Sequence, residues 1–229
     1  MKKLLKKIDV KAFVIIIGLI IFEAIIFFLT KPFLQEPLVL GSALDDKIPF
    51  IPHFIWIYVF WYFMLFAVPY YLAKKDSYCF CKYIMTYIIT TVISGIIFVA
   101  FPNTVVRANI QGTDIASTLV KIIYFLDTPN INCFPSIHCL YSFLFIFGIF
   151  NIKGEVPSWI KTIITILSIL VVFSTLFIKQ HVIYDAIGSF VIGIVVWVIV
   201  DKFKLYNNIH KLLYKNTNYE NTKINTQVA

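Results

Sequence analysis

The chain has 229 residues, of which 60% are hydrophobic and 17% aromatic, and its mean hydropathy is +0.86. These values exceed those of soluble globular domains and indicate an integral membrane protein. The net charge of +8 comes mainly from lysines, which a cytoplasmic surface beside anionic lipid headgroups explains, so no nucleic-acid partner is expected.

Five apolar segments are long enough to cross a hydrocarbon core of about 30 Å, which takes about 20 helical residues. They cover residues 12–29, 54–73, 83–101, 159–178 and 182–200. A sixth, shorter segment covers 137–150, and its helix is expected to begin a turn earlier, at Phe134 and Pro135. We therefore predict an all-α protein, in which residues 1–201 form a six-helix membrane bundle. Residues 202–229 are predicted to be a polar cytoplasmic tail that becomes disordered from Asn207.

The lysines set the expected orientation, because basic residues near the ends of membrane helices stay in the cytoplasm. With both termini inside, most of the basic residues are cytoplasmic. The basic residues left on the outer side are Lys31, Lys47, Arg107, Lys121 and Lys179. The segments that precede the fourth and sixth membrane helices therefore meet at the outer face.

The first apolar segment follows several lysines, as in a secretory signal, but residues 28–32 contain no small-residue cleavage site. We expect an uncleaved first helix. Glu23 within it is costly against lipid, so its side chain is expected to face the bundle. A structural hydrogen bond explains Glu23 more simply than a catalytic role, because it lies deep between the two membrane surfaces.

A polar loop leads into the short apolar segment at 137–150, which is the fourth in chain order, through Pro135, Ser136 and His138. Free backbone amides at a helix start bind anions, so Ser136 and its neighbouring amides are candidates to hold phosphate oxygens. His138 follows within the first turn. Taken alone, the motif is more typical of a helix start with a polar residue near the membrane interface, and the anion site gains support only from the residues that follow.

His181 and Asp185 stand four residues apart at the outer start of the last helix, two residues after Lys179. At this spacing both side chains lie on one helix face, and the carboxylate can accept a hydrogen bond from one ring nitrogen. The other nitrogen is then free to act as a nucleophile. A structural His–Asp pair is the alternative, although the topology places both His138 and His181 at the same membrane face.

Arg107 is the only arginine in the chain and is predicted to lie at the same outer face. A planar guanidinium with its fixed fork of donors suits a phosphate better than a lysine does. Arg107, Ser136 and Lys179 are therefore the candidate phosphate ligands.

These motifs, in this order, resemble the signature of the phosphatidic acid phosphatase type 2 superfamily over roughly residues 50–195. Its second part is Pro-Ser-x-His, matched at 135–138, and its third part is matched by Ser174, His181 and Asp185. The loop residues around Pro102 and Asp127 look like the branch that includes aureobasidin-resistance, inositol phosphotransferase-like and sphingomyelin-synthase-like proteins, and like small bacterial members of it.

The chain also departs from the family pattern. Ala100 and Ala108 stand where the first motif has a lysine and a proline, and Thr175 replaces the arginine of the third motif. Two cations of the family are therefore missing. Lys179 is the candidate to supply one of the lost charges.

The resemblance implies a lipid phosphate or pyrophosphate phosphatase in a bacterial cytoplasmic membrane, with its active site facing outward. His181 would attack phosphorus, Asp185 would orient it and His138 would protonate the leaving oxygen. No metal or other cofactor is expected, because the chain offers no carboxylate cluster. A lipid headgroup phosphotransferase and a non-enzymatic transporter that keeps the fold remain alternatives.

The second apolar segment is rich in aromatic residues, and two readings of them stay open. They are either the lining of a lateral lipid entrance or an ordinary aromatic belt and core. The residues concerned are Trp56, Tyr58, Trp61 and Tyr62.

Overall fold

The computed structural model describes residues 9–31 and 36–214, which are mostly helical, and the predicted all-α class is confirmed. In chain order the helices are α1 (Val10–Thr30), α2 (Ile55–Lys75), α3 (Ser77–Ala100), α4 (Ile115–Leu126), α5 (Ile137–Asn151), α6 (Ser158–Phe177) and α7 (Ile183–Lys202). Five of them, α1, α2, α3, α6 and α7, are long and apolar enough to cross a membrane.

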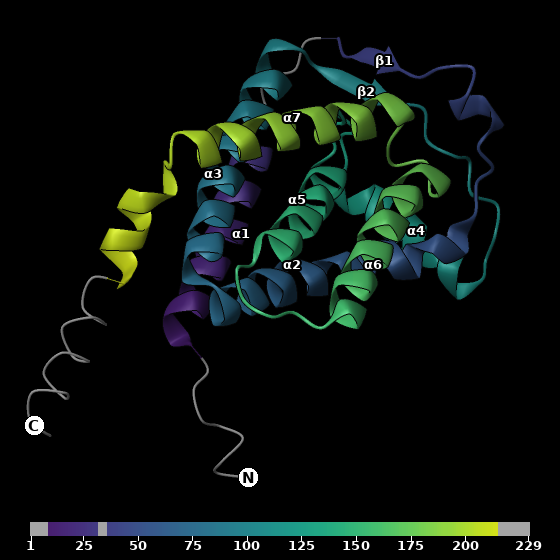
Figure 1. The fold of residues 1–229 in the computed structure, drawn as a ribbon. Helices are drawn as coiled ribbons and strands as arrows, with labels where there is room; N and C mark the ends of the chain where they lie inside the picture. Colours follow the sequence, from purple (N-terminus) through teal and green to yellow (C-terminus); the bar gives the residue numbers. More distant parts are fainter. Residues whose placement is uncertain (1–8, 32–35, 215–229) are drawn as a thin grey trace, which may run out of the picture.

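Helix α5 lies in the middle of the bundle, where it packs against α2, α3, α6 and α7 (Figure 1). Its side chains are apolar or aromatic on all sides, which is typical of a helix that other helices surround. Leu140, Tyr141, Leu144 and Phe145 are completely buried. Helix α1 packs mainly against α2 and α3 and keeps much of its apolar surface exposed.

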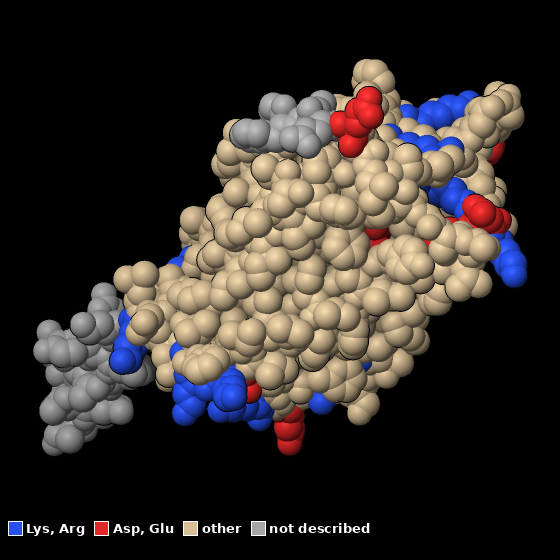
Figure 2. Space-filling model, turned by 90° about the horizontal axis from the view of Figure 1, so that it is seen from above, with Lys and Arg blue, Asp and Glu red and all other residues tan. Residues whose placement is uncertain are grey.

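Short elements cover one end of the bundle. Strand β1 (Leu38–Leu40) pairs in parallel with β2 (Asn103–Val105), and the 3₁₀ helices η1 (Asp45–Lys47) and η2 (Pro52–Phe54) lie between β1 and α2. The start of α1 and the end of α7 lie at the opposite end (Figure 1). Figure 2 shows charged side chains gathered at these two ends, with a broad and almost uncharged band between them, as a lipid-facing surface requires.

Helix α4 is not among the helices predicted from the sequence, since its 12 residues are too few to span a membrane. Asp114 caps it, since its carboxylate accepts hydrogen bonds from the Ser117 amide at 3.1 Å and from the Ser117 hydroxyl at 2.6 Å. These hydrogen bonds lower the pKa of Asp114. The buried residues Ala116, Ser117 and Val120 share one face of α4, which packs against η2 and α2. Helix α4 therefore covers the end of the bundle near η2 and carries Asp127 at its carboxyl end.

The two helix boundaries expected around residues 134 and 207 need correction. Helix α5 begins at Ile137, because Ser136 takes the non-helical cap position and Pro135 precedes it. Residues 206–214 are helical, and Ile209 and Leu213 pack against the core, so the expected disorder does not begin at Asn207. Residues 215–229 lie outside the described residues, and the domain boundary at 201 stays a prediction.

Candidate active site

Two histidines meet at the end of the bundle that carries β1 and β2, with ring centroids 6.2 Å apart. His138 is the second residue of α5, and His181 lies in the turn between α6 and α7. The Ser189 hydroxyl on α7 donates to the Ser136 carbonyl at 2.8 Å, which ties α7 to the start of α5. Gly188 lets the Phe134 ring approach α7 closely, because a β-carbon at this position would overlap the ring. These contacts fix the distance between the two histidines.

The hydrogen bond expected between His181 and Asp185 is present, with Nδ1 and Oδ2 3.1 Å apart. It forms although His181 precedes the helix, since α7 begins at Ile183. The same Oδ2 accepts from the Val182 amide at 3.0 Å, which holds the carboxylate at the helix start. Asp185 is completely buried, so its position is well determined by the surrounding chain. Because Nδ1–H of His181 donates to Asp185, the lone pair on Nε2 stays free.

His138 lies between two aromatic rings of α2. Its ring stacks on Tyr58 with centroids 4.4 Å apart and lies 4.2 Å from the ring centroid of Trp61. Its Nε2 is buried and has no hydrogen-bond partner among the described residues. Tyr58 and Trp61 are themselves only 2% exposed. These two aromatic residues therefore orient His138 rather than form a belt at the membrane surface.

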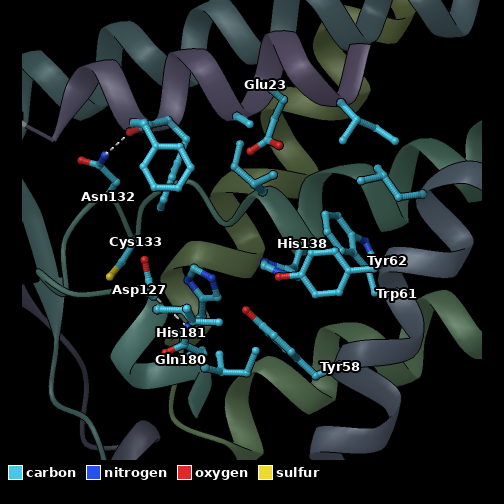
Figure 3. Close-up of a pocket in the computed structure, with 18 of the residues that line it drawn as sticks. Glu23, Tyr58, Trp61, Tyr62, Asp127, Asn132, Cys133, His138, Gln180 and His181 are labelled. Carbon is cyan, nitrogen blue, oxygen red and sulfur yellow. Dashed lines mark hydrogen bonds between the residues drawn. The ribbon is translucent and has the colours of Figure 1, made fainter. Parts of the chain in front are cut away.

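An inner cavity of 320 Å³ lies among α1, α2, the end of α4 and the start of α5, and Figure 3 shows both histidines facing into it. Its walls are mostly apolar and aromatic. Three lining side chains, Phe28, Tyr62 and Leu126, are 61%, 51% and 65% exposed, so the cavity opens on the lipid-facing surface. Cys133 also lines it, and burial raises the pKa of this thiol, which argues against a thiolate nucleophile.

A second, outer cavity of 490 Å³ is more polar and lies under the segment around η1. Arg107, Lys179, Asp45 and Asp46 contribute to its walls. His181 contributes to the walls of both cavities. A group bound to His181 can therefore contact the polar outer cavity on one side and the apolar inner cavity on the other.

The Arg107 guanidinium is held by the carboxyl end of α4. One amino group donates to the Tyr124 carbonyl at 2.9 Å, and the other pairs with the Asp127 carboxylate. Its Nε is buried without a partner among the described residues. Asp127 also pairs with Lys31 at 3.1 Å and accepts from the Gln180 amide at 3.3 Å. Lys31, Asp127 and Gln180 were not among the predicted site residues.

Lys179 and Ser136 have local roles in the structure. The Lys179 ammonium donates to the Asp45 carbonyl at 2.8 Å, and its φ of 54° lies in the left-handed region that lysine rarely adopts. The sharp turn at Lys179 brings His181 back over the bundle. The Ser136 hydroxyl accepts from the Cys139 amide at 3.3 Å and caps α5. It is buried and is not among the lining residues of either cavity.

The positions of the two missing family cations are now visible. Ala100 is the exposed last residue of α3, whereas Thr175 is completely buried in α6, where its hydroxyl donates to the Val172 carbonyl at 2.8 Å. Lys31 reaches the Asp127 carboxylate from the end of α1.

Within residues 9–31 and 36–214, no group of three or more His, Cys, Asp or Glu side chains is arranged to hold a metal ion.

Comparison with known proteins identifies the class that this fold and site define. The model of the PAP2 superfamily matches residues 76–209, which is more than half of the chain and includes both histidines and Asp185. The chain belongs to the PAP2 superfamily, whose members are in general phosphatase-type enzymes. Neither the curated proteins nor the solved structures gave a match to it.

Proposed function

We propose that the protein is a membrane lipid phosphate or pyrophosphate phosphatase that acts through a phosphohistidine at the outer membrane face. The observation that carries this proposal is the position of His181. It is paired with Asp185, lies 6.2 Å from His138 by ring centroids and borders both cavities. Both histidines line the inner cavity, so one phosphoryl group bound there can contact both of them.

The reaction has two steps in this geometry. In the first, Nε2 of His181 forms a bond to phosphorus while the bond from phosphorus to the leaving oxygen breaks, and His138 gives that oxygen its proton. In the second, a water molecule forms a bond to phosphorus and gives a proton to His138, while the bond from phosphorus to Nε2 of His181 breaks. Inorganic phosphate leaves and both histidines return to their starting states.

The cations near His181 would hold the nonbridging oxygens. Arg107 and Lys179 line the outer cavity, and Lys31 lies beside Arg107 through their shared partner Asp127. Positioned charges of this kind supply most of the catalysis in phosphoryl transfer. The hydroxyl of Ser136 is used as a helix cap, so we assign Ser136 a contribution through the position of α5 and its free backbone amides.

The opening of the inner cavity supports a lipid substrate. Its exposed rim lies on the membrane-facing surface, so an acyl or isoprenoid chain can remain in lipid while the phosphate reaches His181. The positive side chains of Lys31, Arg107 and Lys179 would attract the anionic headgroup. Membrane lipids are therefore the proposed partners.

A headgroup phosphotransferase is the second candidate, and the apolar wall of the inner cavity favours it. Its apolar side chains, such as Ile20, Phe27 and Ile137, can hold the apolar chain of an alcohol acceptor. The resemblance of the loop residues to the sphingomyelin-synthase-like branch points the same way. The chemistry at His181 would be the same, with an alcohol in place of water in the second step.

One experiment tests these proposals together. The purified protein in detergent is given a panel of lipid phosphates and pyrophosphates in excess chelator, and inorganic phosphate and new lipid species are measured in parallel. We expect phosphate release without added metal. Acceptor-dependent lipid products with little free phosphate would identify the transferase instead. Absence of turnover, together with substrate flux across vesicles, would overturn both and identify a transporter.

A further inference from the structure

Glu23 on α1 points into the inner cavity, as Figure 3 shows, and it lies outside the part of the chain that matches the family. The structural hydrogen bond expected for it is not found. Within residues 9–31 and 36–214, the Glu23 carboxyl forms no hydrogen bond or ion pair. The other side chains that α1 contributes to the cavity wall are apolar or aromatic, such as Ile20, Ala24 and Phe27.

A carboxyl group without a partner is costly at this depth, because both membrane lipid and an apolar cavity wall fail to replace water. His138 lines the same cavity, and its buried Nε2 also has no hydrogen-bond partner among the described residues. Two residues with unpaired hydrogen-bonding groups therefore line one space of 320 Å³. This arrangement is typical of a binding site, in which a few polar groups fix the orientation of a ligand inside mostly apolar walls.

The position of Glu23 tells which part of the ligand it meets. Helix α1 ends at Thr30 at the outer side, so Glu23 lies about two turns, or roughly 10 Å, deeper along the helix. The phosphoryl group belongs at His181, beside the polar outer cavity. Glu23 therefore faces the alcohol part of the substrate, beyond the ester oxygen that His138 protonates.

We infer that Glu23 accepts a hydrogen bond from a hydroxyl or amide N–H on the alcohol part of the substrate, a few atoms from the phosphoester oxygen. This rests on the proposed function. The preferred substrates are then lipid phosphates whose backbone carries such a donor. Plain isoprenoid phosphates and fully acylated glycerol phosphates carry none, so Glu23 would be left unpaired by them and they would be poorer substrates.

Matched lipids separate this hydrogen bond from chain length. The purified wild-type protein is assayed with a lysophosphatidate, with its 2-deoxy analogue of the same acyl chain and with ceramide 1-phosphate, which carries an amide as well as a hydroxyl. We expect kcat/KM for lysophosphatidate to exceed that for the deoxy analogue on the order of 10- to 100-fold. The ceramide substrate shows whether an amide N–H serves in place of the glycerol hydroxyl.

Variants then assign the preference to the residue. In Glu23→Leu, the ratio of kcat/KM for lysophosphatidate to kcat/KM for the deoxy analogue should fall to about one. Turnover of the deoxy analogue should stay within a few fold of the wild-type value. Glu23→Gln, which can still accept a hydrogen bond, should keep part of the ratio. Glu155→Gln is the control, because Glu155 is exposed in the turn between α5 and α6 at the opposite end of the bundle.

The outcomes are distinct. Equal kcat/KM for the matched lipids in the wild-type protein, or an unchanged ratio in Glu23→Leu, overturns the inference and leaves the proposed phosphatase standing. Absence of turnover with every lipid phosphate overturns both. If Glu23→Leu does not fold, the wild-type ratio and the Glu23→Gln ratio decide the matter.

Discussion

Arg107 and Asp127 form an ion pair near His138 and His181, and the same carboxylate also holds Lys31 and Gln180. Asp127 thus occupies one of the two amino groups that form the donor fork of Arg107, and the Tyr124 carbonyl occupies the other. Both members of the pair are partly accessible, with side chains 14% and 24% exposed. A phosphate that enters the site must therefore compete with Asp127 for Arg107 and Lys31.

The first prediction follows from this competition. Asp127→Asn keeps a hydrogen-bond acceptor for Arg107 and removes the competing negative charge. We expect half-inhibition by inorganic phosphate or vanadate at a concentration roughly two- to five-fold lower than in the wild type, since accessible ion pairs contribute at most about 1 kcal/mol. A weaker inhibition by phosphate would show that Asp127 chiefly holds Arg107 and Lys31 in place.

The second prediction concerns the fork of Arg107 itself. Arg107→Lys keeps the charge, but an ammonium cannot reproduce two parallel hydrogen bonds to phosphate oxygens. We expect kcat/KM to fall at least about ten-fold, with a loss in kcat as well as in KM, because the contact strengthens in the transition state. Near wild-type kcat/KM in a folded Arg107→Lys protein would limit Arg107 to anchoring α4, and Lys179 and Lys31 would remain as the phosphate ligands.

The third prediction tests the orienting role of Asp185. Asp185→Asn can still accept from the Val182 amide and cap α7, but it no longer favours the tautomer that leaves Nε2 of His181 free. Turnover should fall on the order of 10²- to 10⁴-fold, with little change in melting temperature. Asp114→Asn serves as the control, because Asp114 caps α4 and is exposed. Equal losses in both variants would refute a specific role for Asp185.

The long helices were predictable because a membrane span needs about 20 apolar residues in a row, a signal that is local in the sequence. The His181–Asp185 pair was predictable for a similar reason, since only four residues separate its members. Helix α4 was not predicted, although the Asp114 cap before an apolar run was a usable signal. With 12 residues, α4 is too short to be predicted as a membrane-spanning helix.

The ion pairs of Asp127 and the surroundings of Glu23 could not be predicted from neighbouring residues in the sequence. Lys31 and Asp127 are far apart in the sequence and meet only because α1 and the end of α4 lie side by side at the inner cavity. Glu23 was expected to have a structural partner, because a bundle-facing carboxyl normally finds one. Only the packing of α1 against α2 and α3 shows that it faces a cavity instead.

The fourth prediction concerns orientation. Single cysteines at Lys47 and Gln111, in a protein without its four native cysteines, should react with a membrane-impermeant thiol reagent in intact cells. Cysteines at Lys75 and Glu155 should not, because the Lys-rich end is expected to be cytoplasmic. All four positions are exposed in the structure, so protein burial does not explain a lack of labelling. Labelling at Lys75 but not at Gln111 would move the active site to the cytoplasmic face.

The last prediction is the most direct test of His181 as the nucleophile. The protein is mixed with an aryl phosphate whose leaving group needs no proton, quenched in alkali to preserve phosphohistidine, and mapped by mass spectrometry. We expect phosphate on His181 in the wild type and in His138→Ala, which lacks only the proton donor, and none in His181→Ala, which should also lose all turnover. Turnover by His181→Ala, or phosphate found on another residue, would contradict the mechanism.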